Sequence, residues 1–414
     1  MNDQSAWTRI VNRIGFWGIV IITIFALAIL FLLYPLFGMI ARSFQGSEDR
    51  IFSLAAYKDF FRLPYYYRTL KHSFAVSSLT TLFAVLLGVP FGFIVARYNI
   101  PGKKILNAMV VISLLSPPFI GAYSWIVLLG RNGFITNLLR LINIEIPTIY
   151  GFRGLLLVFT LKLFPFVYMY VQGALQSFDN SLEEAAENLG VSGVKKLLTV
   201  TFPLILPTIT AGAVIVFMTS MADLGTPLLI GEGYKVLPVL VYEEYMGELG
   251  GDAVMASAMS VIIIICTLSV LLLQRFTIGR RSYSMSGLNP PPIKKLKTGP
   301  FIILTTLSYL IAIIALSPQI TTLVTSFIKT QGPIFVPAFS VKSYTDVWYK
   351  LSANITRTFL YSTIAMVFMI IIGIFTSYVI VRRKSNLTAV LDFILMSPYV
   401  IPGSVIGIIL IMAF

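Results

Sequence analysis

Long apolar runs recur along the whole sequence and decide which kind of fold is possible. They lie at residues 16–40, 74–97, 105–130, 152–172, 204–223, 254–276, 301–326, 359–381 and 391–414. Each is close to the length of about 20 residues with which a helix crosses the hydrocarbon core of a bilayer. Charged residues make up 12% of the chain, against about 25% in a soluble domain. The sequence therefore predicts an all-α polytopic membrane protein with about nine transmembrane helices.

The positions of lysine and arginine predict how the chain is oriented in the membrane. The first apolar run is longer than the core of a cleavable signal peptide, so we expect it to remain as the first helix. With a cytoplasmic N-terminus, most basic segments face the cytoplasm and the acidic stretch 223–252 faces outside. The basic loop after the first run does not fit this orientation, but the later segments agree with one another. The net charge of +14 is then explained by loops beside anionic lipid, without any nucleic acid.

Two parts of the sequence repeat one another. Residues 72–97 align without gaps against 357–382, so that Gly88 meets Gly373 and Arg97 meets Arg382. Blocks on either side keep nearly the same offset, which indicates an internal duplication with parallel repeats. We predict a first repeat at 1–278 with about six spans, a basic, proline-containing linker at 279–299, and a second repeat at 300–414 with about three spans.

A polar segment at 181–207 interrupts the apolar runs. Ser181 and Glu184 have the spacing of a capping box, and Gly190 is a natural helix stop. Ala186 and Gly190 are four residues apart, so we expect a face of small residues on a short cytoplasmic helix. Such a face would let the backbone of a separate protein approach closely. The alternative is an amphipathic helix that lies on the membrane surface.

Several stretches resemble a known family. EAAENLG at 184–190, followed by FPLILP at 202–207, resembles the EAA loop of binding-protein-dependent ABC importer permeases. MADLGTPLLIG at 221–231 and SPYVIPGSVIG at 397–407 are similar to permeases of the ferric-iron uptake type, in which two permease domains are fused. The resemblance implies tandem parallel repeats of the type I, MetI-like permease fold in a bacterial inner membrane.

The resemblance also implies partners and roles. ATP would be bound and hydrolysed by ABC ATPase subunits, two of them, and an extracytoplasmic binding protein would deliver the solute. This chain would bind no cofactor. Ferric iron is the implied substrate, while thiamine, phosphonates, polyamines and sugar phosphates are alternatives because their permeases share the same plan. The residues that would dock the ATPase are Glu184, Ala185, Ala186, Leu189, Gly190, Pro203 and Pro207.

The sequence departs from the family plan in its second half. The repeat offset places a second docking loop at about residue 465, beyond Phe414. We therefore expect an incomplete second repeat, in a fragment or in a chain whose remainder a second permease chain supplies.

Enzyme chemistry is not indicated. The sequence has no GxxxxGK[ST] phosphate-binding loop, and its single histidine and single cysteine argue against a metal site. Asp223 is a candidate for the translocation pathway if it lies at membrane depth, or a turn cap if it lies at the interface. Lys162 is expected to pair or to extend toward the membrane surface. The other pathway or gate candidates are Gly225, Pro117 and Pro398. A secondary transporter or channel without an ATPase, or a membrane anchor, are the alternatives.

Overall fold

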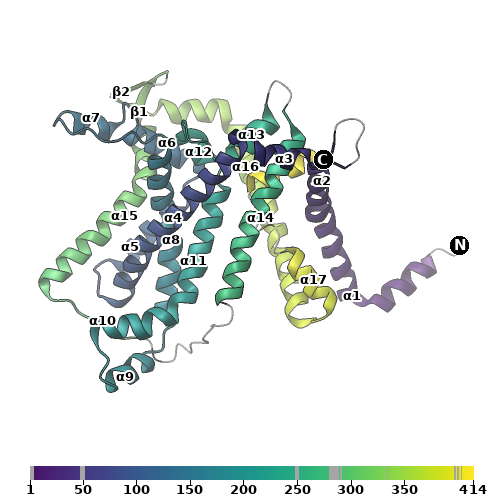
Figure 1. Ribbon diagram of the computed structural model, residues 1–414, viewed down its shortest axis with the longest axis horizontal. Coiled ribbons are helices and arrows are strands. Elements are labelled where there is room, and N and C mark those ends of the chain that lie inside the picture. The colour runs from purple at the N-terminus through teal and green to yellow at the C-terminus, as the bar shows by residue number, and fades with distance from the viewer. Residues whose placement is uncertain are drawn as a thin grey trace. The chain divides into compact units, whose positions relative to one another are not determined.

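The computed structural model describes residues 4–46, 52–247, 251–278, 289, 291–332, 334–395, 398, 401 and 403–414. Nearly all of its elements are helices (Figure 1). Within the described residues, seven helices are long and apolar enough to cross a membrane, or eight if one bent pair counts as a span. The predicted all-α membrane fold is confirmed. The sequence did not predict the small antiparallel hairpin of β1 (Ile328–Gln331) and β2 (Ile334–Phe339).

Most spanning helices coincide with predicted apolar runs. The first span, Gly15–Ser43, combines most of α1 (Gln4–Ala28) with η1 (Ile29–Leu33) and α2 (Tyr34–Ser43). The other long helices are α4 (Pro64–Arg97), α8 (Phe152–Gln176), α11 (Phe202–Ala222), α14 (Ala253–Ile278), α15 (Thr298–Ser326) and α16 (Lys342–Arg382). Shorter helices α3 (Ala55–Arg62) and α13 (Leu237–Met246) lie between them in the chain.

Two predicted spans are wrong as continuous helices. The run at 105–130 is broken into α5 (Lys103–Leu114) and α6 (Pro118–Leu129), and the chain bends by 104° at the break before it continues to α7 (Phe134–Arg140). Pro117 and Pro118 explain the break, because proline lacks an N–H and also disfavours helical backbone in the residue before it. The run at 391–414 likewise contains the end of α17 (Asn386–Leu395) and then α19 (Gly403–Ala413).

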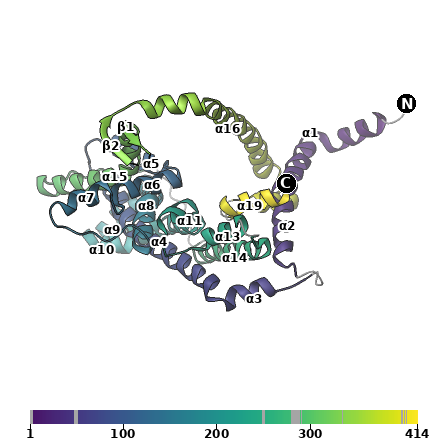
Figure 2. The same ribbon diagram turned by 90° about the horizontal axis from the view of Figure 1, so that it is seen from above.

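The contacts divide the chain into two compact units, Met1–Phe52 with Val324–Phe414, and Ser53–Leu323. The core of the second unit is the packing of α4 against α8, with α11 against both (Figures 1 and 2). Glycines allow this approach. A Cβ atom on Gly88 would lie 2.8 Å from the Cβ of Val167, and one on Gly92 would lie 3.0 Å from the carbonyl oxygen of Tyr168. The α4 backbone therefore lies directly on α8.

Each compact unit combines helices from both predicted repeats. In the unit Ser53–Leu323, α15 packs against first-repeat helices, where the Tyr309 hydroxyl donates to the Pro101 carbonyl at 2.8 Å. In the other unit, α1 packs against α16 and α17, and Trp17 stacks on Tyr378 with ring centroids 4.2 Å apart. An offset of 283 residues maps the span Gly15–Ser43 onto Thr298–Ser326. The helix that packs with the other repeat is therefore, in both cases, the first of its own repeat. The repeat boundaries themselves stay a prediction.

Candidate functional site

The polar segment at 181–207 folds as a short helix that leads back into a span. Helix α9 (Ser181–Asn188) is followed by α10 (Gly193–Lys196), η2 (Leu197–Thr201) and α11. The π-helical turn η2 ends two residues before Pro203, and its last hydrogen bond runs from the Phe202 N–H to the Leu197 carbonyl. Pro203 lies in the first turn of α11 and Pro207 inside it. Both prolines are therefore accommodated within one continuous span.

The start of α9 differs from the predicted capping box. Ser181 does not cap the helix; its N–H donates to an Asp179 carboxylate oxygen at 3.0 Å. Glu184 instead accepts a hydrogen bond from the side-chain amide of Asn180 at 2.5 Å. The capping-box prediction is wrong because the helix begins one residue early, with Asn180 as its first flanking residue. The predicted end is confirmed: Gly190 has a φ of 81°, a left-handed conformation that favours glycine.

The two faces of α9 are unlike. Leu189 is 83% exposed and Leu182 is 42% exposed, and Glu184 and Ala185 are exposed beside them. Ala186 is buried, so its predicted place on a free face is wrong, whereas Gly190 is exposed as predicted. The reason is that the small side chain of Ala186 lets α9 lie close against its own protein. On α9 and the turn after it, the exposed docking candidates are therefore Glu184, Ala185, Leu189 and Gly190, and Pro203 at the start of α11 is exposed as well.

Glu183 forms the inner attachment of α9. Its carboxylate accepts hydrogen bonds from the guanidinium of Arg97 and, at 2.8 Å, from the Thr201 hydroxyl. The Lys196 ammonium lies 3.3 Å from the other carboxylate oxygen, and it also pairs with Glu187 at 2.5 Å. Sequence reasoning missed this network. A signal was present, because adjacent acids on a helix point about 100° apart and so Glu183 and Glu184 cannot share one face.

A second polar cluster lies between the long helices. Asp223 follows α11 and precedes the short helix α12 (Gly225–Ile230). One of its carboxylate oxygens lies 2.5 Å from the Lys162 ammonium of α8, and the other accepts the Thr226 N–H at 2.9 Å. The side chains of Lys162 and Asp223 are only 17% and 5% exposed. Both sequence interpretations of Asp223 therefore apply, since it caps a turn and is also buried beside a cation.

Two helix breaks meet at this cluster. A Cβ atom on Gly225 would lie 2.8 Å from the Cβ of Pro118, so the α11–α12 break packs directly on the α5–α6 break. Of the predicted pathway residues, Asp223, Gly225 and Pro117 come together here. Pro398 belongs to the other compact unit, where it lines a small apolar pocket with Pro35 and Leu36.

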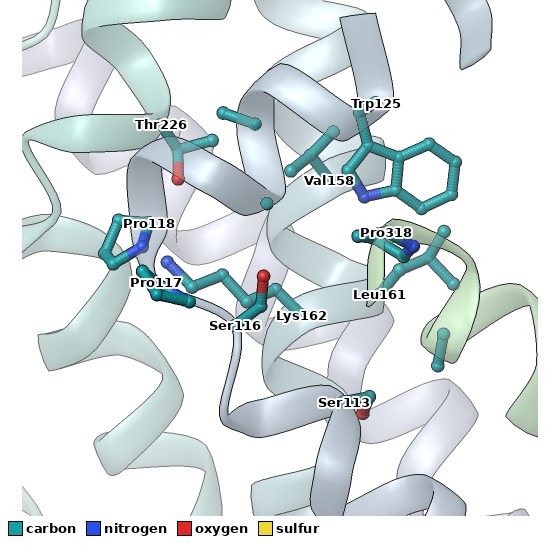
Figure 3. Close-up of a pocket in the computed structure, with 13 residues that line it drawn as sticks. Ser113, Ser116, Pro117, Pro118, Trp125, Val158, Leu161, Lys162, Thr226 and Pro318 are labelled. Atoms are coloured by element: carbon teal, nitrogen blue, oxygen red, sulfur yellow. The ribbon is translucent and has the colours of Figure 1, made fainter. Parts of the chain in front are cut away.

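A small pocket opens beside the ion pair (Figure 3). The Lys162 side chain extends toward Pro117 and Pro118, which lie at the edge of the pocket. The hydroxyl of Thr226, a fully buried residue, also lines the pocket and has no hydrogen-bond partner among the described atoms. The remaining lining residues are Ser113, Ser116, Gly121, Ala122, Trp125, Val158, Leu161, Ala315 and Pro318. In the described part of the chain, no three His, Cys, Asp or Glu side chains are grouped as metal ligands.

Comparison with known proteins identifies the family. Residues 88–282 match the family described as "Binding-protein-dependent transport system inner membrane component". The ferric transport system permease protein FbpB of Actinobacillus pleuropneumoniae is 25% identical over 95% of this chain and 58% of its own length. The molybdenum transport system permease protein ModB of Escherichia coli K12 is 34% identical over 38% of this chain and 68% of its own length.

The other comparisons agree on fold and extent. A second ferric transport permease, from Haemophilus influenzae, is 25% identical over 95% of this chain and 63% of its own length, so the chain spans about three fifths of these two relatives. The structure of a bacterial ABC transporter that imports alginate superposes with a TM-score of 0.52 at 19% identity, covering 67% of this chain and all of that one. The chain thus belongs to the family of binding-protein-dependent transport system inner membrane components, and is a multi-pass membrane protein with the type I, MetI-like fold.

Proposed function

We propose that the chain is the membrane permease of an ATP-driven importer and that α9 docks its ATPase. The observation that carries this proposal is the free face of α9. Leu182 and Ala185 in α9 and Leu189 directly after it are exposed, while the other face of the helix is attached to the protein by buried charges. An exposed apolar face on a firmly held helix suits helix-in-groove recognition by a partner.

The proposed mechanism is a two-state movement of the spans. ATP binding brings two partner subunits together, α9 moves with the subunit that holds it, and the helices change between inward-open and outward-open arrangements. The chain itself catalyses no reaction and binds no cofactor; ATP stays on the partner. We further propose that the N-terminus lies in the cytoplasm of a bacterial cell, with α9 on the same side of the inner membrane. A binding protein delivers solute from outside.

Ferric iron is the first candidate substrate. The ferric transport relatives match along 95% of this chain, whereas the molybdenum transport relative matches along 38%. Thiamine, phosphonates, polyamines and sugar phosphates remain alternatives. Uptake of radiolabelled ferric iron by proteoliposomes of the assembled transporter, with unlabelled molybdate, thiamine, a phosphonate, a polyamine or a sugar phosphate as competitor, separates these possibilities. Uptake that molybdate abolishes would contradict iron as the substrate.

The docking surface is tested by placing a charge on it. Leu189→Glu should weaken co-purification of the ATPase at least about tenfold, because a buried apolar contact of an interface would then hold an unpaired charge. Leu141→Glu is the matched control, because Leu141 is 81% exposed in the chain after α7, outside the proposed surface. Association undiminished by Leu189→Glu would count against the docking role of α9.

A transporter without an ATPase is the second candidate, favoured by the Lys162–Asp223 pair. Buried ionisable pairs in spans are typical of carriers that use ion gradients. The two candidates differ in their energy source. Import that requires the ATPase and ATP supports the importer, and import that persists without them supports the carrier.

A further inference from the structure

The network around Glu183 joins α9 to the helix core. Arg97 is the last residue of α4, and it is 6% exposed, as is Glu183. The guanidinium of Arg97 also lies over the Phe178 ring at 5.3 Å, just before α9 begins. Because the α4 backbone rests directly on α8 at Gly88 and Gly92, a force on Arg97 acts on the packed centre of this unit.

The backbone around this pair is held as well. The Lys294 N–H donates to the Arg97 carbonyl at 2.9 Å, and the Asn99 N–H donates to the Lys294 carbonyl at 3.3 Å. On the α9 side, the Asn180 N–H donates to the Asn289 carbonyl at 2.8 Å. Within the predicted linker 279–299, Lys294 therefore binds the end of α4 and Asn289 binds the start of α9. The Glu183–Arg97 pair lies where three segments are tied together.

A buried ion pair is a poor means of adding stability, because removing two charges from water offsets most of their attraction. An apolar pair of similar volume often serves folding equally well. An ion pair does hold its two partners in one geometry, since guanidinium and carboxylate bind through directional hydrogen bonds. The feature that this pair adds to α9 is therefore a fixed position relative to α4.

We propose that Glu183 and Arg97 are positioning residues that make α4 follow the movement of α9. Glu184, the next residue, faces outward and belongs to the docking surface. Glu183 therefore attaches α9 to the protein, and Glu184 contacts the docked partner. This inference rests on the proposed importer function for its role in transport. The rigid connection itself does not depend on that function. Arg382 ends α16 at the position equivalent to Arg97. In the second repeat, Arg382 is therefore the residue that would join its helix to a second docking loop.

The rigid connection is tested on the permease without its ATPase. Nitroxide labels at Leu86→Cys on α4 and Leu189→Cys after α9, in a Cys266→Ser background, report the distance between these helices; Leu86 is 59% exposed. We expect a narrow distance distribution in the parent. With Glu183→Leu and Arg97→Leu together, the distribution should broaden at least about twofold, because α9 loses its buried attachment. A distribution that stays narrow overturns the proposal, whether or not α9 docks an ATPase.

The role in transport is tested on the assembled importer without labels. Glu183→Leu with Arg97→Leu should leave ATPase association intact and lower transport per ATP hydrolysed at least about tenfold, because hydrolysis no longer moves α4. Arg131→Leu with Glu232→Leu removes an exposed arginine–glutamate pair and is the matched control. Wild-type transport in the first double variant overturns the proposal. Lost association in that variant would also overturn it, since Glu183 would then belong to docking.

Arg97→Lys covers the case in which the double-leucine variant does not fold. Lysine keeps the charge but not the planar fork of the guanidinium. The label distances should broaden and transport per ATP should fall together, each less than in the double variant. Wild-type values for both quantities in Arg97→Lys would overturn the proposal.

Discussion

The Lys162 ammonium lies 2.5 Å from the Asp223 carboxylate and joins the continuous helix α8 to the break between α11 and α12. The second oxygen of Asp223 holds the first turn of α12 through the Thr226 N–H at 2.9 Å. A single carboxylate therefore fixes the break and attaches it to its neighbour. Because the pair is buried, each charge depends on the other for its stabilisation.

The first prediction concerns the loss of one partner of this pair. Lys162→Met leaves the Asp223 carboxylate buried without its cation, which should lower the free energy of unfolding by about 3–5 kcal/mol. Asp223→Asn added to Lys162→Met removes the orphaned charge and keeps an acceptor for Thr226. The double variant should therefore return to within about 2 kcal/mol of the parent. Equilibrium unfolding in detergent micelles measures both values.

The control for this prediction is the exposed pair of Arg131 and Glu232, whose side chains are 67% and 53% exposed. Water solvates either charge when its partner is missing, so Arg131→Met should leave the unfolding transition unchanged. Equal losses in Lys162→Met and Arg131→Met would mean that Lys162 and Asp223 are solvated and not paired in a buried site.

The second prediction concerns the contact between α4 and α8. Gly88→Ala places a Cβ 2.8 Å from the Cβ of Val167 and 3.0 Å from the Phe164 carbonyl oxygen, so the helices must separate. The expected loss of unfolding free energy is about 1–3 kcal/mol. Gly173→Ala in α8 is the control, because no described atom outside its two chain neighbours and the adjoining backbone of its own helix lies within 4 Å of its Cβ position. Alanine there should gain up to about 1 kcal/mol from helix propensity. Equal stabilities of the two variants would contradict the close packing.

The third prediction concerns the hydrogen bonds between α5 and α8. The Tyr168 hydroxyl donates to the Asn107 side-chain oxygen, which also accepts from the Gln172 amide at 3.3 Å. Asn107→Leu leaves the buried hydroxyl without an acceptor and should cost about 1–3 kcal/mol. Tyr168→Phe removes the donor, while Gln172 still supplies one to Asn107, and should cost about 0.5–1.5 kcal/mol. Thermal unfolding of both variants checks the order, and a larger loss in Tyr168→Phe would contradict it.

Much of the fold could be predicted because bilayer crossing makes strong demands on local sequence. The run at 152–172 became α8 and the run at 204–223 became α11, since a helix in lipid must be apolar along its whole length. Prolines such as Pro117 and Pro118 indicate a kink in a span, but they do not predict a bend as large as the 104° found here. Hydropathy averages over about 20 residues and does not register a change of direction within the run.

The candidate site was only partly predictable for a related reason. Asp223 and Lys162 were each recognisable as polar groups in apolar surroundings, but their pairing joins α11 to α8 across 61 residues. No local pattern encodes such a contact. On α9, the motif pointed to Ala186 as a free surface residue, whereas packing against the protein buries it. The direction in which a helix face points is set by its long-range partners, here Arg97 acting on Glu183.

The last prediction concerns the pH dependence of the α9 attachment. The hydrogen bond from the Lys196 ammonium lowers the pKa of Glu187 below its ordinary value of 4.5. A carboxyl group with a lowered pKa in the folded state adds stability that is fully present above the ordinary pKa and is lost as the pH falls through the lowered one. Amide hydrogen exchange in α9, corrected for the intrinsic rate, should therefore show protection that is constant from neutral pH to the ordinary pKa and weakens below it. Glu187→Gln removes this titrating group and should flatten the profile, so an identical acid-induced loss in that variant would assign the change to another carboxyl group.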